Sequence, residues 1–378
     1  MDFHLSPEQE QWGREGLDFA ESRLRAGATD REKAHHIPPD LIREMGQRGL
    51  LGVNIPKSLG GSEAGVVSYA VALREIAAVD ASLGVTMAVT NMVGEIIRAF
   101  GTPEQQERHI PKLTSGEYFA GAFALSEPGS GSDAAAMTAR AERIPEGWRL
   151  NGEKAWITSG DQAGVIVVWA RTGGPETKHR GISCFLVEGN QPGVVAGKPE
   201  EKMGLRASHT VGLSLNDVIV PETARLGREG EGFKIAMTAL DGGRIGIASQ
   251  ALGMGRSAFR LARKHVLSQD KAAVAGAQDM QFRLADMMTR LDSAWLLTLR
   301  AAWLKERGQP FTQEAAMAKV MATEGANKVI LDAMRVQGAE GGFEDGGLTR
   351  LYRDCRVTEI YEGTSEIQRV VIAKNLLG

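Results

Sequence analysis

The sequence has little cysteine, no run of basic residues and no long apolar run. Its 378 residues include two cysteines, Cys184 and Cys355, far apart, with no disulfide framework and no metal-ligand spacing. A reducing compartment, the cytoplasm, is therefore expected. A formal net charge of −3 argues against a nucleic-acid partner. No apolar stretch reaches about 18 residues, so no membrane span is expected, and the polar start MDFHLSPEQEQW shows no secretory apolar core.

The composition that remains is ordinary for a globular protein, with 43% apolar and 24% charged residues. Residues 6 to about 115 predict helices, with start signals at Ser6-Pro7 and Thr102-Pro103. From about 119 to 221, short apolar runs rich in β-formers predict an antiparallel β-domain, with a hairpin turn at Asn151-Gly152.

Long segments with helical periodicity follow from about residue 232 and predict a four-helix bundle. Its last helix is expected to start in a capping box, Ser365-Glu366-Ile367-Gln368. The fold class is therefore multi-domain α+β, with an N-terminal helical domain at 1–118, a middle β-domain at 119–230 and a C-terminal helical bundle at 231–378.

Two stretches of the β-domain have the composition of a ligand site. FALSEPGSGSD, from Phe123 to Asp133, leads a strand into a flexible Gly/Ser loop whose backbone N–H groups can approach a ligand. In NGEKAWITSG, strand alternation places Trp156 and Thr158 on one face, where they suit a flat heteroaromatic ring. The plain alternatives are a strand-to-loop turn for the first stretch and a core tryptophan for the second.

Two stretches of the helical part also stand out. LDGGR, from Leu240 to Arg244, puts two glycines inside a helix, which implies either a ligand or another helix packed closely there. RVTEIYEGTSEIQR contains Glu359, Glu362 and Glu366, and Gly363 predicts a break in the helix after Glu362. A carboxylate held before such a break, in apolar surroundings, acquires a raised pKa that suits proton abstraction. Glu359 is expected to be solvated or ion-paired, and Glu366 to favour the helix N-terminus.

Together, SEPGSGSD, WITSG, IYEGTSEIQR and GTPEQQERHIPKLTSGE resemble the acyl-CoA dehydrogenase family over nearly the whole chain. The resemblance implies an FAD-containing oxidoreductase of fatty acid metabolism, active as a homotetramer or heterotetramer. It implies that Glu362 removes the α-proton of an acyl-CoA thioester while hydride passes to N5 of the flavin, giving the 2-enoyl-CoA. An electron-transfer flavoprotein then accepts the electrons.

The resemblance also assigns binding residues. Substrate contacts are implied for Ser132, Asp241, Arg244 and Gly363. Glycine at position 243 favours Glu362 as the base, because the isovaleryl-type relatives carry their base near that position. Flavin contacts are implied for Phe123, Leu125, Ser126, Gly131, Ser132, Trp156, Ile157, Thr158, Thr364, Ser365 and Glu366.

Two segments depart from the family pattern. Where the family carries Arg-x-x-Phe-Gly, this chain has Leu267 to Lys271, and where it carries Gln-x-x-Gly-Gly, this chain has Arg335 to Ala339. In the family both reach the ADP half of the FAD bound mainly by a neighbouring subunit. Three readings stay open: FAD held by altered contacts, a related partner subunit that completes the FAD site, or a flavin-free structural partner.

The substrate is less determined. The segment 82–101 aligns with the region that lines the acyl pocket in the family and resembles short-chain members, which favours a short or branched acyl chain. The reverse reaction, reduction of an enoyl-CoA, uses the same residues, because the potential of the electron partner sets the direction.

Overall fold

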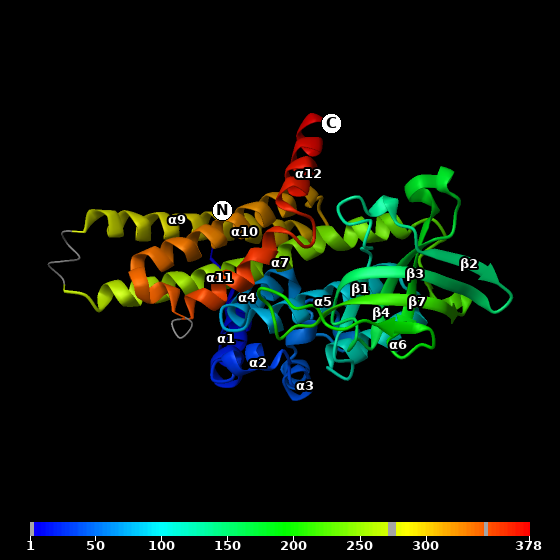
Figure 1. Ribbon diagram of the computed structural model, residues 1–378, viewed down its shortest axis with the longest axis horizontal. Helices are drawn as coiled ribbons and strands as arrows, with labels where there is room; N and C mark the ends of the chain where they lie inside the picture. The colour runs from blue at the N-terminus through cyan, green and yellow to red at the C-terminus, as the bar shows by residue number, and fades with distance from the viewer. Residues whose placement is uncertain (1–3, 271–276, 344–346) are drawn as a thin grey trace.

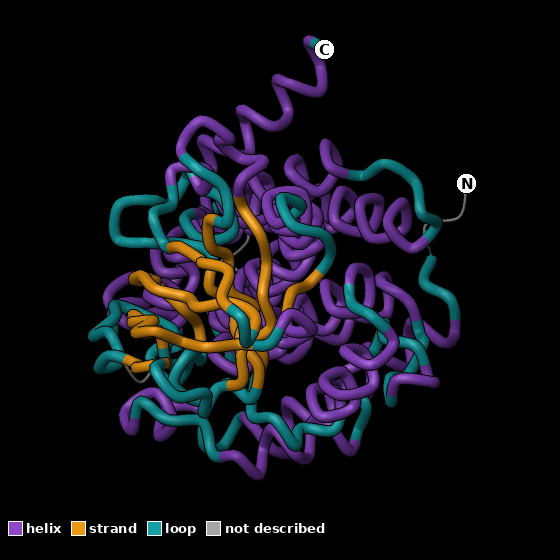
Figure 2. The backbone as a smooth tube through the Cα atoms, turned by 90° about the vertical axis from the view of Figure 1, so that its right-hand side faces the viewer, coloured by secondary structure: helices purple, strands orange, loops and turns teal. Residues whose placement is uncertain are grey.

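Along the chain, helices precede and follow a middle segment that forms a sheet. The computed structural model describes residues 4–270, 277–343 and 347–378. The sheet lies at one end of the long C-terminal helices, and the N-terminal helices lie along their side (Figures 1 and 2). This is the predicted helical–β–helical order.

The N-terminal part is a cluster of helices. The predicted start signals are confirmed, because Ser6 and Thr102 each cap a helix in a capping box with a glutamine three residues later. The helices are α1 (Pro7–Phe19), α2 (Ala28–Ala34), α3 (Pro39–Gln47), α4 (Gly65–Ala77), α5 (Ala81–Phe100) and α6 (Pro103–Thr114).

Helix α5 is a long apolar helix in the interior of the protein. Its 20 residues are long and apolar enough, by length and composition alone, to cross a membrane, with a mean hydropathy of 1.2. Within the fold, 78% of this apolar stretch is buried, as in the core helix of a soluble protein. A helix that is apolar on all sides is expected at the centre of a domain, and α5 packs against α4, α6, α7 and the sheet.

The middle part is a mixed sheet in the order β6-β7-β3-β2-β4-β5-β8, with β1 paired to β4. The antiparallel prediction is wrong for two pairings, since β1 and β2 both run parallel to β4. The strands are β1 (Gly121–Ala124), β2 (Arg140–Ile144), β3 (Gly147–Thr158), β4 (Val165–Arg171), β5 (Ile182–Glu188), β6 (Val194–Ala196), β7 (Thr210–Val220) and β8 (Arg225–Leu226).

The hairpin predicted at Asn151-Gly152 is also wrong. Both residues lie inside β3, and the turn that joins β2 to β3 falls at Pro145-Glu146. Gly152 has φ +145° where the register with β7 shifts, so the glycine serves a bulge in the strand. The dipeptide pattern is the same for a turn and a bulge, which explains the error.

The C-terminal part contains three long helices that pack together, with a shorter helix, α12, against α10. The two glycines at 242 and 243 do not interrupt α7. The helices are α7 (Gly232–Leu267), α9 (Gln278–Glu306), α10 (Thr312–Gln337), α11 (Leu348–Arg356) and α12 (Ser365–Leu377).

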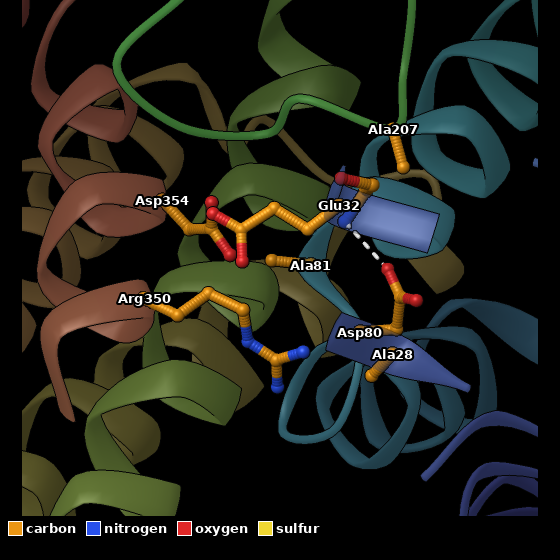
Figure 3. Close-up of a pocket in the computed structure, with 8 residues that line it drawn as sticks. Ala28, Glu32, Asp80, Ala81, Ala207, Arg350 and Asp354 are labelled. Atoms are coloured by element: carbon orange, nitrogen blue, oxygen red, sulfur yellow. Dashed lines mark hydrogen bonds between the residues drawn. The ribbon is translucent and has the colours of Figure 1, made fainter. Parts of the chain in front are cut away.

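All three parts meet at one buried polar cluster. Figure 3 shows Asp354 and Arg350 of α11 facing Glu32 of α2 and Asp80, the N-cap of α5. Asp354 also accepts a 2.6 Å hydrogen bond from the N–H of Leu205 in the middle part. Burial raises the pKa of Asp354 to about 7. This cluster ties the three parts together.

Candidate active site

A short loop between α11 and α12 carries Glu362. The regular helix ends at Arg356, and the next begins at Ser365, so the predicted break is present. Glu362 has φ +52° and Gly363 has φ +90°, so two successive left-handed residues turn the chain. Glycine adopts this conformation without strain, whereas at Glu362 it has to be maintained by surrounding contacts.

The predicted capping box at Ser365 is wrong by one residue. Thr364 is the N-cap of α12, and its hydroxyl accepts the N–H of Ile367 at 3.3 Å. Gln368 does not reach back to a cap; its Nε2 donates to the carbonyl oxygens of Gly363 at 2.8 Å and of Glu362 at 3.3 Å. Because α12 starts directly after Thr364, the side chain of Gln368 reaches back to the turn at Glu362 and Gly363 and holds it.

The Glu362 carboxylate points at Gly243 of α7. A Cβ atom added at Gly243 would lie 1.8 Å from Glu362 Oε2 and 3.0 Å from the sulfur of Met92 on α5. Oε2 itself is buried and has no hydrogen-bond partner. The Glu362 carboxylate thus occupies the space beside Gly243, and a side chain at position 243 would collide with it.

Burial controls the acidity of Glu362. It raises the pKa of the carboxyl to about 7, while the positive charges of Lys319 and Arg244 act in the opposite direction. The pKa of Glu362 is therefore raised, as the sequence predicted. A carboxyl group with a pKa near neutral pH is partly ionised there and is basic enough to accept a proton. By contrast, Glu359 pairs with Arg356 at 2.9 Å, as expected.

Asp241 and Arg244 lie together on the same face of α7. The Arg244 guanidinium is buried and bonded to Asp241 Oδ1, and Asp241 Oδ2 accepts a 2.6 Å bond from the hydroxyl of Thr312 at the start of α10. Burial lowers the pKa of Arg244, with Asp241 and Glu362 opposing that shift. The structure therefore brings Asp241, Gly243 and Arg244 into the neighbourhood of Glu362.

The two β-domain stretches also adjoin each other. The carbonyl of Ser126 accepts the N–H of Ala155 at 2.9 Å, which places the Phe123–Ser132 stretch beside Trp156. The Phe123 ring contacts Trp169 in a tilted arrangement with 4.3 Å between ring centroids, and Leu125 is buried. These two residues are part of the support beneath the loop, whereas Gly131 and Ser132 are exposed.

A buried ion pair joins the same two stretches. Lys154 Nζ lies 2.9 Å from Glu127 Oε1 and also donates to the carbonyl of Leu125 at 3.2 Å. Glu127 accepts further bonds from the N–H and hydroxyl of Thr138 and from the N–H of Ala139. Its partners satisfy both oxygens, and this network sets the position of the loop relative to β3.

Trp156 is not a core residue. Its side chain is 66% exposed and its φ is +63°, at the point where β3 and β7 shift register between Lys154 and Ile157. Ile157 is buried, and Thr158 is half-buried at the end of the strand. The plain alternative of a core tryptophan is therefore wrong, and the fold presents a flat indole to the outside of the sheet.

The two segments that depart from the family pattern lie far from Glu362. Leu267 ends α7 and lies about 36 Å along the helix from Gly243, at 1.5 Å per residue. Arg335 to Ala339 ends α10, and His265 is 3.8 Å from Glu340 just beyond it. Residues next to the two segments therefore lie close together at the far end of the bundle; Lys271 of the first segment lies outside the described residues.

Comparison with known proteins agrees with this architecture. Family models of the acyl-CoA dehydrogenase N-terminal, middle and C-terminal domains match residues 6–117, 122–218 and 230–377. The mitochondrial short-chain specific acyl-CoA dehydrogenase of Bos taurus is 45% identical over 95% of this chain and 88% of its own.

Solved structures give the same result. Butyryl-CoA dehydrogenase from Megasphaera elsdenii superposes with a TM-score of 0.97 at 37% identity over all of both chains. A chain from a structure described as an electron transferring flavoprotein of Acidaminococcus fermentans gives 0.96 at 38% identity, also over all of both chains.

Fold and site together define a flavin-dependent dehydrogenase of acyl thioesters. The chain belongs to the acyl-CoA dehydrogenase family, whose members are FAD-dependent.

The residues present fit a flavin. A Cβ atom added at Gly129 or Gly131 would meet nothing within 4 Å, so the loop leaves open space in which a ligand can approach its backbone. The exposed indole of Trp156 offers a flat surface beside that loop.

Sequence reasoning missed the residues that support this site: Lys319, Gln368, Glu127, Lys154 and Thr312. For two of them a signal was present. Lys319 interrupts the apolar face of AAMAKVMA, where a lysine is expected to be buried with a partner, and Lys154 lies at an inward position of β3. The partners themselves are distant in sequence and could not be inferred.

Proposed function

We propose that this chain oxidises a short-chain acyl-CoA at the α,β bond, with Glu362 as the base that removes the α-proton. The observation that carries this assignment is the buried Oε2 of Glu362, which has no hydrogen-bond partner and faces the open position at Gly243. A carboxylate oxygen without a donor, on a group with a pKa of about 7, is able to accept a proton.

The chain's own residues would orient the thioester. Gly363 and the backbone N–H of Glu362 are proposed to contact the thioester, where a donor at the carbonyl oxygen would stabilise the developing enolate. Asp241, Arg244 and Ser132 are proposed to bind the CoA portion. When bound, FAD supplies the acceptor for the hydride.

The flavin is proposed to lie against the β-domain and the start of α12. Its contacts would be Phe123, Leu125, Ser126, Gly131, Ser132, Trp156, Ile157, Thr158, Thr364, Ser365 and Glu366. The exposure of Trp156 supports this placement, and so does the proximity of the two β-domain stretches.

Self-association, as a dimer or tetramer or with a related subunit, is proposed from the exposed apolar side chains of the C-terminal helices. These are Phe282, Met288, Leu296 and Trp303 on α9, Met321 and Leu331 on α10, and Val370, Leu376 and Leu377 on α12. Exposed apolar side chains on these helices suit burial against another chain. Leu267 lies far along α7 from Gly243. This distance also supports a second copy of the chain as the source of the contacts to the ADP half of FAD.

An electron-transfer flavoprotein is proposed as the electron acceptor, and the cytoplasm as the compartment. Domain bounds of 1–118, 119–230 and 231–378 are likewise proposed, supported by the connections between α6 and β1 and between β8 and α7. Nothing in the comparisons favours a flavin-free partner or an obligatory related subunit.

The test is anaerobic titration of the purified protein with acyl-CoAs of increasing length and branching, followed by loss of flavin absorbance. We expect bleaching by butyryl-CoA and little by long chains, and none with the Glu362→Gln variant. Wild-type bleaching by Glu362→Gln would refute the assignment of the base, whereas bleaching by long chains alone would refute only the chain length.

A further inference from the structure

Lys319 of α10 is a fully buried cation directly beneath the turn that carries Glu362. Its side chain has 0% exposure, and its ammonium donates a 2.7 Å hydrogen bond to the carbonyl of Gly363. No carboxylate in the described part of the chain forms an ion pair with it. Burying an ammonium group without a paired anion is costly, and burial lowers the pKa of Lys319 to about 8.

We propose that Lys319 is a positioning residue for Glu362, whose ammonium fixes the Gly363 carbonyl and keeps the neighbouring Glu362 ionised and ready to accept a proton. This inference rests on the proposed role of Glu362 as the base. It extends that role to a residue that need not touch the substrate.

The other charged groups around the two residues already have partners. Arg244 is bonded to Asp241 on α7, and Glu95 of α5 pairs with Lys305 of α9. Glu359 pairs with Arg356, and Glu324 with Arg369. The uncharged phenols of Tyr69 on α4 and Tyr361 complete the titratable surroundings of Glu362.

Lys319 and Glu362 are therefore the two charges of this region without a close partner of their own. Lys319 bonds the carbonyl of the residue that follows Glu362, and in a buried site the attraction between two such charges is weakly screened. Lys319 is the first of the two charges that hold down the pKa of Glu362, and Glu362 is the group that most opposes the shift of Lys319.

The sign of the effect on the reaction follows from the role of the base. Glu362 accepts a proton only when ionised, so activity rises as the pH rises through its pKa. The charge of Lys319 opposes the effect of burial on the pKa of Glu362. Removing that charge therefore moves the pKa of Glu362 upward. The rate is then lost near neutral pH and recovered at higher pH.

Lys319→Met tests the proposal, because methionine has a similar length but neither charge nor N–H. Gln368→Met is the matched control, since it removes a donor to the same carbonyl without changing any charge. The readout is exchange of the α-protons for solvent deuterium in an acyl-CoA analogue with sulfur in place of the β-carbon, followed by NMR against pH. Hydride cannot leave from that position, so exchange reports the proton step alone.

We expect the midpoint of exchange to rise by about one pH unit or more in Lys319→Met and to stay unchanged in Gln368→Met, whose rate alone falls. Lys319→Arg, which keeps the charge, should keep a midpoint near that of the wild type. An unchanged midpoint in Lys319→Met, or equal shifts in Lys319→Met and Lys319→Arg, would overturn the proposal. Wild-type exchange by Glu362→Gln would instead show that the base itself is misassigned.

Discussion

A single methyl group at position 243 should displace the proposed base. In Gly243→Ala the new Cβ would lie 1.8 Å from Glu362 Oε2, whereas ordinary contact begins at 3.4 Å. To restore ordinary contact, the carboxylate must therefore move away by about 1.6 Å. The other close neighbour, the Met92 sulfur, is at 3.0 Å and on a flexible side chain. A misplacement of about 1 Å can reduce the rate about 100-fold, so we expect at least that loss in kcat/KM.

The fold should survive this change. Alanine in place of glycine inside a helix contributes roughly 0.5–1 kcal/mol of stability, which offsets part of the local strain. Gly325→Ala in α10 is the matched control, because a Cβ there would meet nothing within 4 Å. It should gain similar stability and keep full activity.

Steady-state kinetics with a short acyl-CoA and thermal unfolding by circular dichroism separate the two effects. If Gly243→Ala unfolds like the control and turns over within threefold of the wild type, Glu362 is not held against α7 in the way that the structure shows. Loss of activity in both variants would mean that the rate depends on helix flexibility instead of on contact with the base.

Three further predictions follow from buried or exposed side chains. The pKa of Asp354 is raised to about 7, so the folded state binds more protons than the unfolded state above about pH 4, and stability falls as pH rises toward 7. Asp354→Asn should flatten that slope in melting temperatures measured from pH 4 to 8, and an unchanged slope would refute the reading. Lys154→Met leaves Glu127 buried without its cation and should lower the free energy of unfolding in urea by about 3–5 kcal/mol; a loss below about 1 kcal/mol would contradict this. Trp156→Ala removes a side chain that is 66% exposed, so the stability of the flavin-free protein should change little while FAD retention on gel filtration falls. Full retention would place the flavin elsewhere.

Local signals were sufficient where the structure depends on neighbouring residues. Ser6 and Thr102 cap their helices as predicted because the hydrogen-bond partner is three residues away in each case. The same kind of signal misplaced the cap of α12 by one residue, because Thr364 and Ser365 are both good caps and only the direction of the preceding turn selects between them.

Distant pairing decided what the pattern left ambiguous. Asn151-Gly152 reads equally as a turn or a bulge, and β7, about 60 residues later, makes it a bulge. The length and apolar composition of α5 fit either a membrane span or a core helix. Packing against the surrounding helices and the sheet makes it a core helix. A local pattern carries no information about which segment will cover it.

The sequence by itself determined the order of the three parts, the break before α12, and Glu362 as the residue to examine. These depend on composition, periodicity and one glycine, all within a few residues. Only the tertiary structure decided that Glu362 lies against Gly243, that Lys319 and Gln368 hold its turn, and that Trp156 is exposed. Those contacts join residues that are far apart in the sequence, and the burial of Glu362 in this surrounding raises its pKa to about 7.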